Sequence, residues 1–281
     1  MVLSRPTGKG GQMHRYSYAI DDPVGTPGAK ILRMVTRGSR VLEIGAGPGS
    51  ITRPLVEELG CEVVAVENDP HAIPLLRQCA RSVYELDLND GGWARALRDA
   101  EAGFDYVIAA DVLEHLIDPE RVMAEMQSLL NPGGAIILSL PHAGHAAIQA
   151  CLWNDDFAYQ DTGLLDRTHI RFFGMKNIQS MACAHGMVIA QADFVVRHPA
   201  AFEFARYWKA MPWRIRSMLL RKRFATTYQV ITRSTFPENA EQPIDLMQLR
   251  PPAALAPRKK LLKTVRKKME ARFARARSLP A

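Results

Sequence analysis

The residues best suited to bind a ligand lie in the stretch RVLEIGAGPG, residues 40–49, which carries three glycines. Glycine adopts backbone angles that a Cβ would forbid, and it lets a ligand lie close to the main chain. Glu67 follows Gly47 at about the twenty-residue distance that is usual for a carboxylate that binds ribose hydroxyls. A glycine loop alone is a weak signal. The loop and the acid together indicate a site for a ligand that contains a nucleoside.

These residues need a strand before the loop and a helix after it. Val41, Leu42 and Ile44 form a short apolar run, which predicts a buried strand. Ser50 is placed to cap a helix over residues 51–59. Strand, glycine turn and helix in this order are typical of the ligand-binding start of a doubly wound α/β sheet.

The spacing of the glycines separates two classes of ligand. A dinucleotide fingerprint reads GxGxxG, but this chain has Ser50 at the third glycine position. The pattern here, E-x-G-x-G-x-G, resembles motif I of the class I S-adenosylmethionine-dependent methyltransferases. The resemblance continues in FDYVIAADVLEHLIDPERV and LLNPGGAIILSLP; it covers residues 40–141 with specific motifs and 142–235 more loosely. Ser50 and the later motifs disfavour an NAD-dependent dehydrogenase.

The resemblance implies a Rossmann-like methyltransferase fold, an α/β architecture with a doubly wound, seven-stranded, mostly parallel sheet. NPGG, which follows Leu130, predicts a turn. Apolar runs predict the strands after the first at 61–66, 82–86, 104–110, 135–140, 187–196 and 224–233. The last two of these would form the antiparallel pair that completes the sheet.

The resemblance also implies S-adenosylmethionine as the cofactor. Glu67 would accept the ribose hydroxyls, Asp87 would take the exocyclic amine of adenine, and Leu88 would lie against the ring face. The predicted cofactor-binding residues are Glu43, Gly45, Ala46, Gly47, Gly49, Glu67, Asn68, Asp87, Leu88 and Asp111.

A long insertion, residues 142–174, follows the fifth predicted strand and is expected to shape the acceptor site, because connections of this length are uncommon. His142, His145 and His169 are its candidate catalytic residues, since imidazole has a near-neutral unperturbed pKa and can remove a proton from a hydroxyl. Oxygen acceptors make use of such groups, so O-methylation is favoured. The sequence leaves the acceptor atom open among O, N and C.

A metal site is considered separately. Asp111, Glu114 and His115, with His169, offer oxygen and nitrogen ligands at a spacing related to a cluster that holds Mg²⁺ in some methyltransferase families, including small-RNA 2′-O-methyltransferases. Mg²⁺ prefers oxygen ligands and water, so two histidines are not its usual set. No metal is favoured, and these four residues are the candidates if one binds.

The acceptor is expected to be a glycan or another small molecule. DRTHIRFF, residues 166–173, resembles a stretch in bacterial methyltransferases of glycan and small-molecule biosynthesis. A sugar hydroxyl of a surface glycan, or of its lipid-linked precursor, is the first choice. The alternative from another class is a non-catalytic module that binds the cofactor, or has lost it, and acts through a basic tail.

The predicted organisation has four parts: a disordered N-terminus at 1–15, a methyltransferase domain at 16–235, a linker at 236–257 and a basic amphipathic tail at 258–281. From Arg250 onward the chain has eleven Lys or Arg and one acid, a net charge of +10, whereas the whole chain has +7, so the remainder is at −3. An apolar stripe in a basic helix is typical of a helix that lies on an anionic membrane. The stripe would consist of Leu262, Val265, Met269 and Phe273.

The sequence contains no run of about eighteen apolar residues, so no membrane span is predicted. The N-terminus lacks an apolar signal region, and the four cysteines are scattered without a CxxC motif. A cytoplasmic protein is expected, with peripheral contact at the inner membrane surface through the tail. Nucleic acid is disfavoured as a partner, because phosphate contacts need no apolar stripe.

Overall fold

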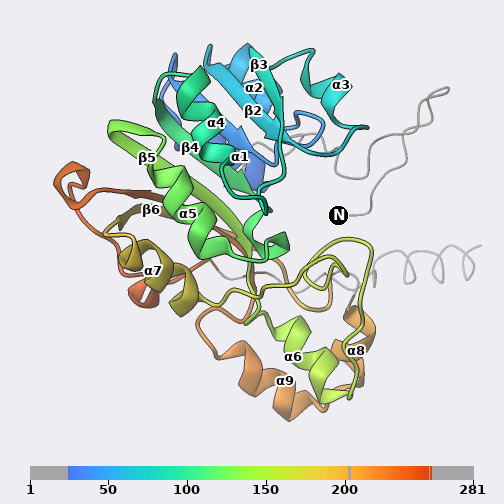
Figure 1. Cartoon of the computed structure of the whole chain (residues 1–281). Coiled ribbons are helices and arrows are strands. Elements are labelled where there is room, and N and C mark those ends of the chain that lie inside the picture. The colour runs from blue at the N-terminus through green and yellow to red at the C-terminus, as the bar shows by residue number, and fades with distance from the viewer. Residues whose placement is uncertain (1–24, 202–203, 253, 255–281) are drawn as a thin grey trace, which may run out of the picture.

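The computed structural model describes residues 25–201, 204–252 and 254. They form one seven-stranded sheet with helices on both faces (Figure 1). The strand order is β3-β2-β1-β4-β5-β7-β6. Strand β7 runs in the direction opposite to the other six strands, so its pairings with β5 and β6 are antiparallel and the remaining pairings are parallel. The predicted doubly wound α/β fold is confirmed, including the antiparallel pairing of the last two strands.

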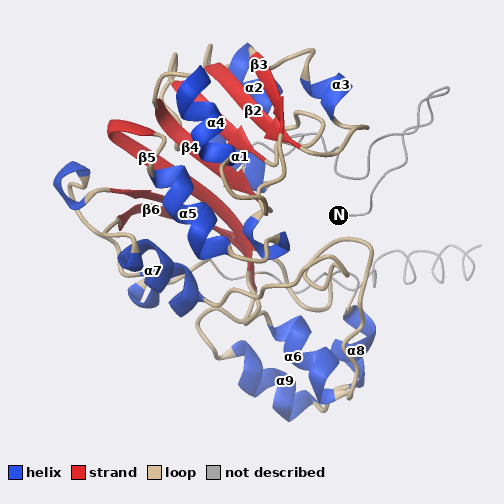
Figure 2. Cartoon of the chain, in the orientation of Figure 1, coloured by secondary structure: helices blue, strands red, loops and turns tan. Residues whose placement is uncertain are grey.

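The elements follow each other as alternating strands and helices, interrupted by the insertion after β5 (Figure 2). The strands are β1 Arg40–Ile44, β2 Glu62–Glu67, β3 Ser82–Glu85, β4 Phe104–Ala110, β5 Leu130–Pro141, β6 Val188–Val196 and β7 Thr227–Thr235. The α-helices are α1 Pro27–Leu32, α2 Thr52–Glu57, α3 Ile73–Leu76, α4 Trp93–Ala100, α5 Pro119–Gln127, α6 Ala146–Trp153, α7 Met175–Ala184, α8 Ala205–Ala210 and α9 Trp213–Leu220. Short 3-10 helices are η1 Leu113–His115, η2 Pro237–Asn239 and η3 Leu246–Gln248.

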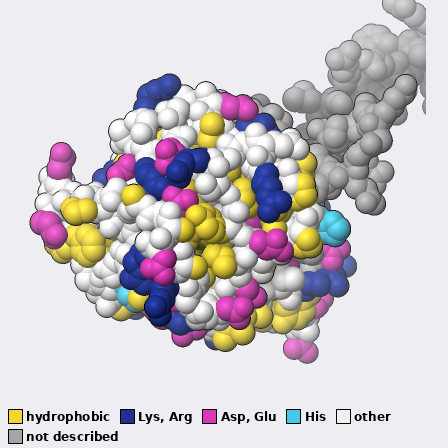
Figure 3. Space-filling model, turned by 45° about the horizontal axis from the view of Figure 1, so that its top comes forward, with side chains coloured by type: hydrophobic (Ala, Val, Ile, Leu, Met, Phe, Trp, Pro, Cys, Tyr) yellow, Lys and Arg dark blue, Asp and Glu magenta, His cyan; other side chains and the backbone are white. Residues whose placement is uncertain are grey.

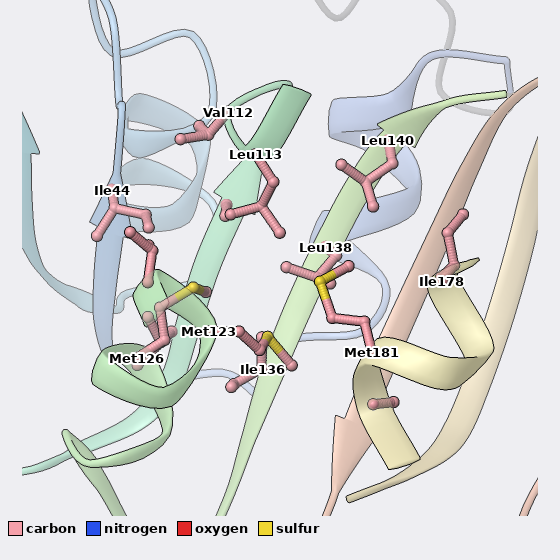
Figure 4. Packing of buried hydrophobic residues seen from close by; sticks show 14 of the residues in the cluster. Ile44, Val112, Leu113, Met123, Met126, Ile136, Leu138, Leu140, Ile178 and Met181 are labelled. Carbon is pink, nitrogen blue, oxygen red and sulfur yellow. The ribbon is translucent and has the colours of Figure 1, made fainter. Parts of the chain in front are cut away.

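Alternate side chains of each strand enter two different cores. Leu42 and Ile44 pack in the layer that contains α4, α5 and α7, whereas Val41 packs with α1 and α2. Figure 4 shows methionines of α5 and α7 against the apolar side chains of β5, among them Met126 and Met181. Full burial of one such side chain stabilises the fold by roughly 2 kcal/mol. Side chains along each strand are thus buried alternately on the two faces of the sheet, which leaves the ends of the strands to contact a ligand.

The helix after the glycine loop begins later than predicted. Its first residue is Thr52, and the capping position is Ile51, which makes no side-chain cap. The N–H of Arg53 donates to the Gly49 carbonyl (3.0 Å), so the turn is closed by main-chain bonds. The predicted cap by Ser50 is thus wrong. Because the helix starts beyond it, Ser50 stays in the loop.

NPGG does not end the strand in which it lies. The pairing of β5 with β4 moves from Phe104–Leu130 directly to Tyr106–Ala135, so the four residues between Leu130 and Ala135 bulge outward. Gly133 has φ +81°, which suits this tight excursion. The residues predicted as a turn therefore form a bulge within β5. Because both flanks of the bulge pair with β4, the strand starts earlier than predicted.

The insertion contributes to a small second layer below the sheet, which we call the helical unit and define as α6, α8 and α9 (Figure 1). Its own apolar cluster includes Ile148, Phe204 and Leu219. The return of the insertion is fixed beside η1, because the N–H groups of Ile170 and Arg171 both donate to the Glu114 carbonyl (2.9 and 3.0 Å). The loop 154–173 is thereby held next to the strand ends.

Part of the predicted linker packs on the domain. Leu246 is fully buried, its N–H donates to Gln179 Oε1 (2.9 Å), and the N–H of Ile244 donates to the Ile189 carbonyl (2.7 Å). Residues 244–249 therefore pack on α7 and β6. The predicted N-terminal segment 1–15 and the tail 258–281 lie outside the described residues. Among the residues that the structure does describe, no helix has the length and apolar character to cross a membrane.

Candidate active site

A cavity of about 690 Å³ lies at the carboxyl ends of the parallel strands. Parallel strands end at the same edge of a sheet, and residues far apart in the sequence therefore meet there. Nine of the ten predicted cofactor residues line the cavity: Glu43, Gly45, Ala46, Gly47, Glu67, Asn68, Asp87, Leu88 and Asp111. Gly49 is not among the lining residues. Its φ is +87°, and a Cβ there would lie 2.8 Å from Cys79 Sγ, so this glycine serves close packing.

Glu67 holds the glycine loop in place. Its Oε2 accepts the N–H of Gly47 (2.6 Å), and its Oε1 accepts the N–H groups of Asn68 and Asp69 (2.8 and 2.9 Å). A carboxylate has about four acceptor positions, so capacity for a ligand hydroxyl remains. Glu67 thus combines a structural contact with a binding position on the cavity wall.

The loop glycines leave room that a side chain would occupy. Gly45 has φ +61°, and a Cβ there would lie 2.6 Å from Val112 Cγ2. Gly47 has φ +55°, with no atom within 4 Å of the place where a Cβ would stand. The main chain at Gly47 is therefore open to a ligand in the cavity.

Glu43 is a buried acid beneath this loop. The Thr52 hydroxyl donates to its Oε2 (2.6 Å), yet desolvation by burial raises the pKa of Glu43 to about 8. The Glu67 carboxylate adds a smaller upward contribution to that pKa. The Glu43 side chain is consequently protonated in the folded protein at neutral pH.

The proton on Glu43 predicts a pH dependence of stability. The folded state keeps this proton up to the Glu43 pKa of about 8, whereas the unfolded chain releases it above the ordinary glutamate pKa of 4.5. The folded state binds more protons in this window, so the free energy of unfolding falls as pH rises, by up to about 1.4 kcal/mol per pH unit. We expect Glu43→Gln to remove this slope, as measured by urea unfolding at several pH values. Glu85→Gln, at the exposed end of β3, is the control; an unchanged slope in Glu43→Gln would contradict the assignment.

Asp87 and Leu88 line the cavity beyond Glu67. Oδ1 of Asp87 accepts the main-chain N–H and the side-chain amide of Asn89 (2.8 and 3.2 Å), while the residue as a whole is exposed. Leu88 is buried and offers an apolar wall. An exposed acid beside an apolar side chain suits the edge and face of a purine ring.

Asp111 stands at the end of β4 in an unusual backbone conformation. Its φ is +57°, a region that non-glycine residues rarely adopt and that occurs at functional sites. The Gln229 amide donates to its carboxylate. Asp111 is exposed at the cavity, but the protein around it raises the pKa of this carboxyl to about 6 by desolvation, opposed by the bond from Gln229.

Two of the three predicted catalytic histidines lie in the packing of the helical unit and the sheet rather than on the cavity wall. His145 is fully buried; its Nδ1 accepts the N–H of Ala147 (3.1 Å), and its Nε2 donates to the Arg197 carbonyl (2.8 Å). His142 is buried with its Nδ1 at 3.2 Å from the Thr227 carbonyl. Burial lowers the pKa of both imidazoles to about 4. With both nitrogens engaged, His145 has no free position for a substrate proton.

His169 does line the cavity, beside two other candidate ligands. Its Nε2 lies 3.9 Å from Glu114 Oε1, and its ring centroid lies 4.8 Å from that of His115 at a steep angle. Within the described chain, His169 Nδ1 and both Glu114 carboxyl oxygens have no hydrogen-bond partner although they are buried. Burial lowers the pKa of His169 to about 4. For Glu114, burial first and the Asp111 charge second hold the pKa well above its usual range.

The cavity also contains residues that were not predicted from the sequence. Tyr228 and Gln229 line it from β7, and Thr162, Gly163 and Asp166 line it from the insertion. An antiparallel strand begins at the edge where parallel strands end, so the start of β7 could have been included from topology alone. The insertion residues carry no comparable signal, because their position depends on contacts with η1.

Comparison with known proteins identifies the family to which this cavity belongs. A family profile described as "Methyltransferase domain" matches residues 17–192, more than half of the chain. A ubiquinone biosynthesis O-methyltransferase of Cereibacter sphaeroides is 36% identical over 103 residues, 36% of this chain and 41% of that protein. The enzyme of the same name in Xanthomonas campestris is 30% identical over 108 residues, 38% of this chain and 45% of that protein. The match thus spans less than half of the length of these relatives.

A crystal structure from Bacillus halodurans, assigned to a methyltransferase, shares the fold: its TM-score is 0.53, with 13% identity, over 75% of this chain and 98% of that one. The chain belongs to the class I S-adenosylmethionine-dependent methyltransferases. The residues present fit this cofactor. Gly47 leaves the main chain open, Glu67 has spare acceptor positions, and Leu88 gives an apolar wall.

Proposed function

We propose that this protein transfers the methyl group of S-adenosylmethionine to a hydroxyl oxygen of a small-molecule acceptor. The observation that carries the proposal is the extent of one cavity, which reaches from Gly47 and Glu67 to Asp111 and His169. The proposed cofactor site and the proposed proton acceptor therefore line the same cavity. The names of the relatives, O-methyltransferases of ubiquinone biosynthesis, support an oxygen acceptor.

The bound cofactor supplies a methyl group on a sulfonium, which is already activated. The protein needs to orient the acceptor and, for a hydroxyl, to receive its proton. His169 is proposed for this role because, of the three predicted histidines, it is the one that lines the cavity, and its lowered pKa leaves the imidazole neutral. Asp111 and Gln229, which are hydrogen-bonded to each other and line the same cavity, fit the role of orienting groups.

The acceptor is proposed to be a small molecule, with a sugar hydroxyl of a glycan or lipid-linked precursor as one candidate and a phenolic hydroxyl as another. Calorimetric titration with S-adenosylmethionine and with NAD tests the cofactor first. Transfer of a labelled methyl group is then measured over phenols, sugars, glycans, lipid extracts and RNA. We expect binding of S-adenosylmethionine alone and label in an oxygen acceptor. Cofactor binding without transfer to any acceptor class would favour the non-catalytic module.

A cation-dependent form of the same reaction is the second arrangement. Single ligand atoms of Glu114, His115 and His169 lie within 4.8 Å of one another, and the partnerless oxygens of Glu114 would gain a partner. Imidazole and carboxylate together suit Mn²⁺, Fe²⁺ or Zn²⁺ better than Mg²⁺. We expect turnover to persist in EDTA, because the proposed proton acceptor needs no metal. Loss of turnover that Mn²⁺ or Mg²⁺ restores would favour the cation instead.

The basic tail, which lies outside the described residues, is proposed to contact an anionic membrane. Its net charge and apolar stripe support this proposal. Because residues 244–249 pack on the domain, a shortened chain should end at Pro252. We expect the full chain to sediment with anionic vesicles at low salt more strongly than the shortened one, while both bind the cofactor equally. Equal sedimentation of the two chains would contradict a role of the tail.

A further inference from the structure

Helix α9 presents large apolar side chains to solvent. The exposed fractions are 67% for Trp213, 54% for Met218 and 38% for Leu220, whereas Leu219 of the same helix is buried in the helical unit. Apolar side chains on the outer side of a helix that is already packed on its inner side have no role in the core. Exposed clusters of this kind mark interaction sites.

Basic residues surround these apolar side chains. The sequence contains no Asp or Glu from Phe204 to Pro237. Over α8, α9 and the turn that follows, the basic residues are Arg206, Lys209, Arg214, Arg216, Arg221, Lys222 and Arg223. All but Arg216, which is partly buried, are exposed. The contacts that the structure gives are to neutral groups: Arg214 lies over the Trp213 ring (5.6 Å), and Lys222 Nζ donates to Gln149 Oε1 (2.9 Å).

None of the ion pairs in the described part of the chain includes a basic residue of α8, α9 or the turn that follows. These basic side chains therefore have no acidic ion-pair partner among the described residues. Charge on the visible face in Figure 3 is mixed, with basic and acidic side chains interspersed. Asp155 and Asp156 follow α6, and Asp156 accepts a hydrogen bond from the Tyr207 hydroxyl. The α9 segment therefore carries a local positive charge, in contrast to the mixed charge of the face in Figure 3.

Tryptophan, methionine and leucine beside arginine are the composition of helices that lie in a membrane interface. The indole would lie among the headgroups, and each basic residue near an anionic surface adds to the attraction. A polyanion such as RNA would use the charges but not Met218 or Leu220. Helix α6 adds Leu152 and Trp153, exposed by 58% and 55%, in the same helical unit.

We propose that the α9 face, defined as Trp213, Arg214, Met218, Leu220 and Arg221, binds the surface of an anionic lipid bilayer. This contact is made by the folded domain. It is distinct from the proposed contact of the tail and does not depend on methyl transfer. It would orient the domain on the membrane, whereas a tail connected by a chain segment would only keep it nearby.

The test uses the full chain and vesicles of equal parts phosphatidylcholine and phosphatidylglycerol. We expect Trp213→Ser with Met218→Ser, and separately Arg214→Glu with Arg221→Glu, to weaken vesicle partitioning by at least about tenfold each. Leu75→Ser, on α3, and Arg77→Glu, directly after it, are the matched controls; both residues are exposed, and these variants should leave partitioning unchanged. Circular dichroism and cofactor titration check that each variant is folded.

Fluorescence quenching by brominated lipids gives a second measurement. Because Trp153 is also exposed, the measurement uses a Trp153→Phe background, in which Trp93 and Trp208 are buried and Trp213 is the remaining exposed tryptophan of the described residues. Its emission should be quenched in these vesicles, and adding Trp213→Phe should remove most of the quenching. Parent-like partitioning of both double variants would overturn the proposal and leave the tail as the contact. Equal binding to pure phosphatidylcholine, or binding to RNA in place of vesicles, would also overturn it.

Discussion

Replacing Glu67 by alanine is expected to weaken the binding of S-adenosylmethionine by at least about tenfold, equivalent to about 1.4 kcal/mol. Two losses combine in this variant. The ribose hydroxyls lose a charged acceptor, and hydrogen bonds to charged groups contribute about 1.5–3 kcal/mol. The N–H groups of Gly47, Asn68 and Asp69 also lose their shared partner, so the glycine loop is no longer held in its binding shape.

Calorimetric titration with S-adenosylmethionine measures the change in cofactor affinity. Glu67→Gln separates the loss of the charged acceptor from the loss of the hydrogen bonds that hold the glycine loop. Glutamine keeps one acceptor oxygen for the loop but carries no charge, so its affinity should fall between those of the parent and the alanine variant. Glu85→Ala, at the end of neighbouring β3, is the control for removal of an acid from the same sheet edge. A folded Glu67→Ala that binds the cofactor as tightly as the parent would contradict the site assignment.

The cofactor half of the cavity could be predicted from the sequence because its position follows from local rules. Glu67 is the last residue of β2, and Gly47 and Asp87 follow the ends of β1 and β3 within three residues. Parallel strands place their carboxyl ends at one edge of the sheet. Strand existence depends on short apolar runs, which a sequence displays. The protonation of Glu43 could not be predicted, because its pKa depends on the burial that the whole loop produces.

The acceptor half depends on contacts between distant segments. His142, His145 and His169 look equivalent in the sequence, yet the first two are bound to carbonyls of residues 227 and 197. Only the pairing of the insertion with η1 brings His169 to the cavity. The same reason explains why residues 244–249 pack although their surroundings have the composition of a linker. Leu246 packs against α7, and the composition of the segment does not indicate that α7 has a surface for it.

Replacing His169 should lower turnover far more than the other two histidine replacements. A general base contributes about 10²–10⁴-fold to a rate, so we expect His169→Gln to reduce kcat by at least about 100-fold on a hydroxyl acceptor. The Kd of S-adenosylmethionine should stay within about twofold, because the proton transfer occurs only in the transition state. His142→Leu and His145→Leu should instead lower the free energy of unfolding, by about 1–3 kcal/mol, because leucine has no donor for the Thr227 or the Arg197 carbonyl.

The comparison of kcat with stability separates these roles for the three histidines. Steady-state kinetics on the acceptor found by the label screen gives kcat, and urea unfolding gives stability for the same variants. His71→Gln, an exposed histidine before α3, is the control and should change neither quantity. Unchanged kcat in His169→Gln would remove the base and leave orientation of the acceptor as the source of the rate. If kcat falls in His169→Gln and the parent is also inactivated by EDTA, the cation at Glu114, His115 and His169 becomes the better account, because the same substitution removes a ligand.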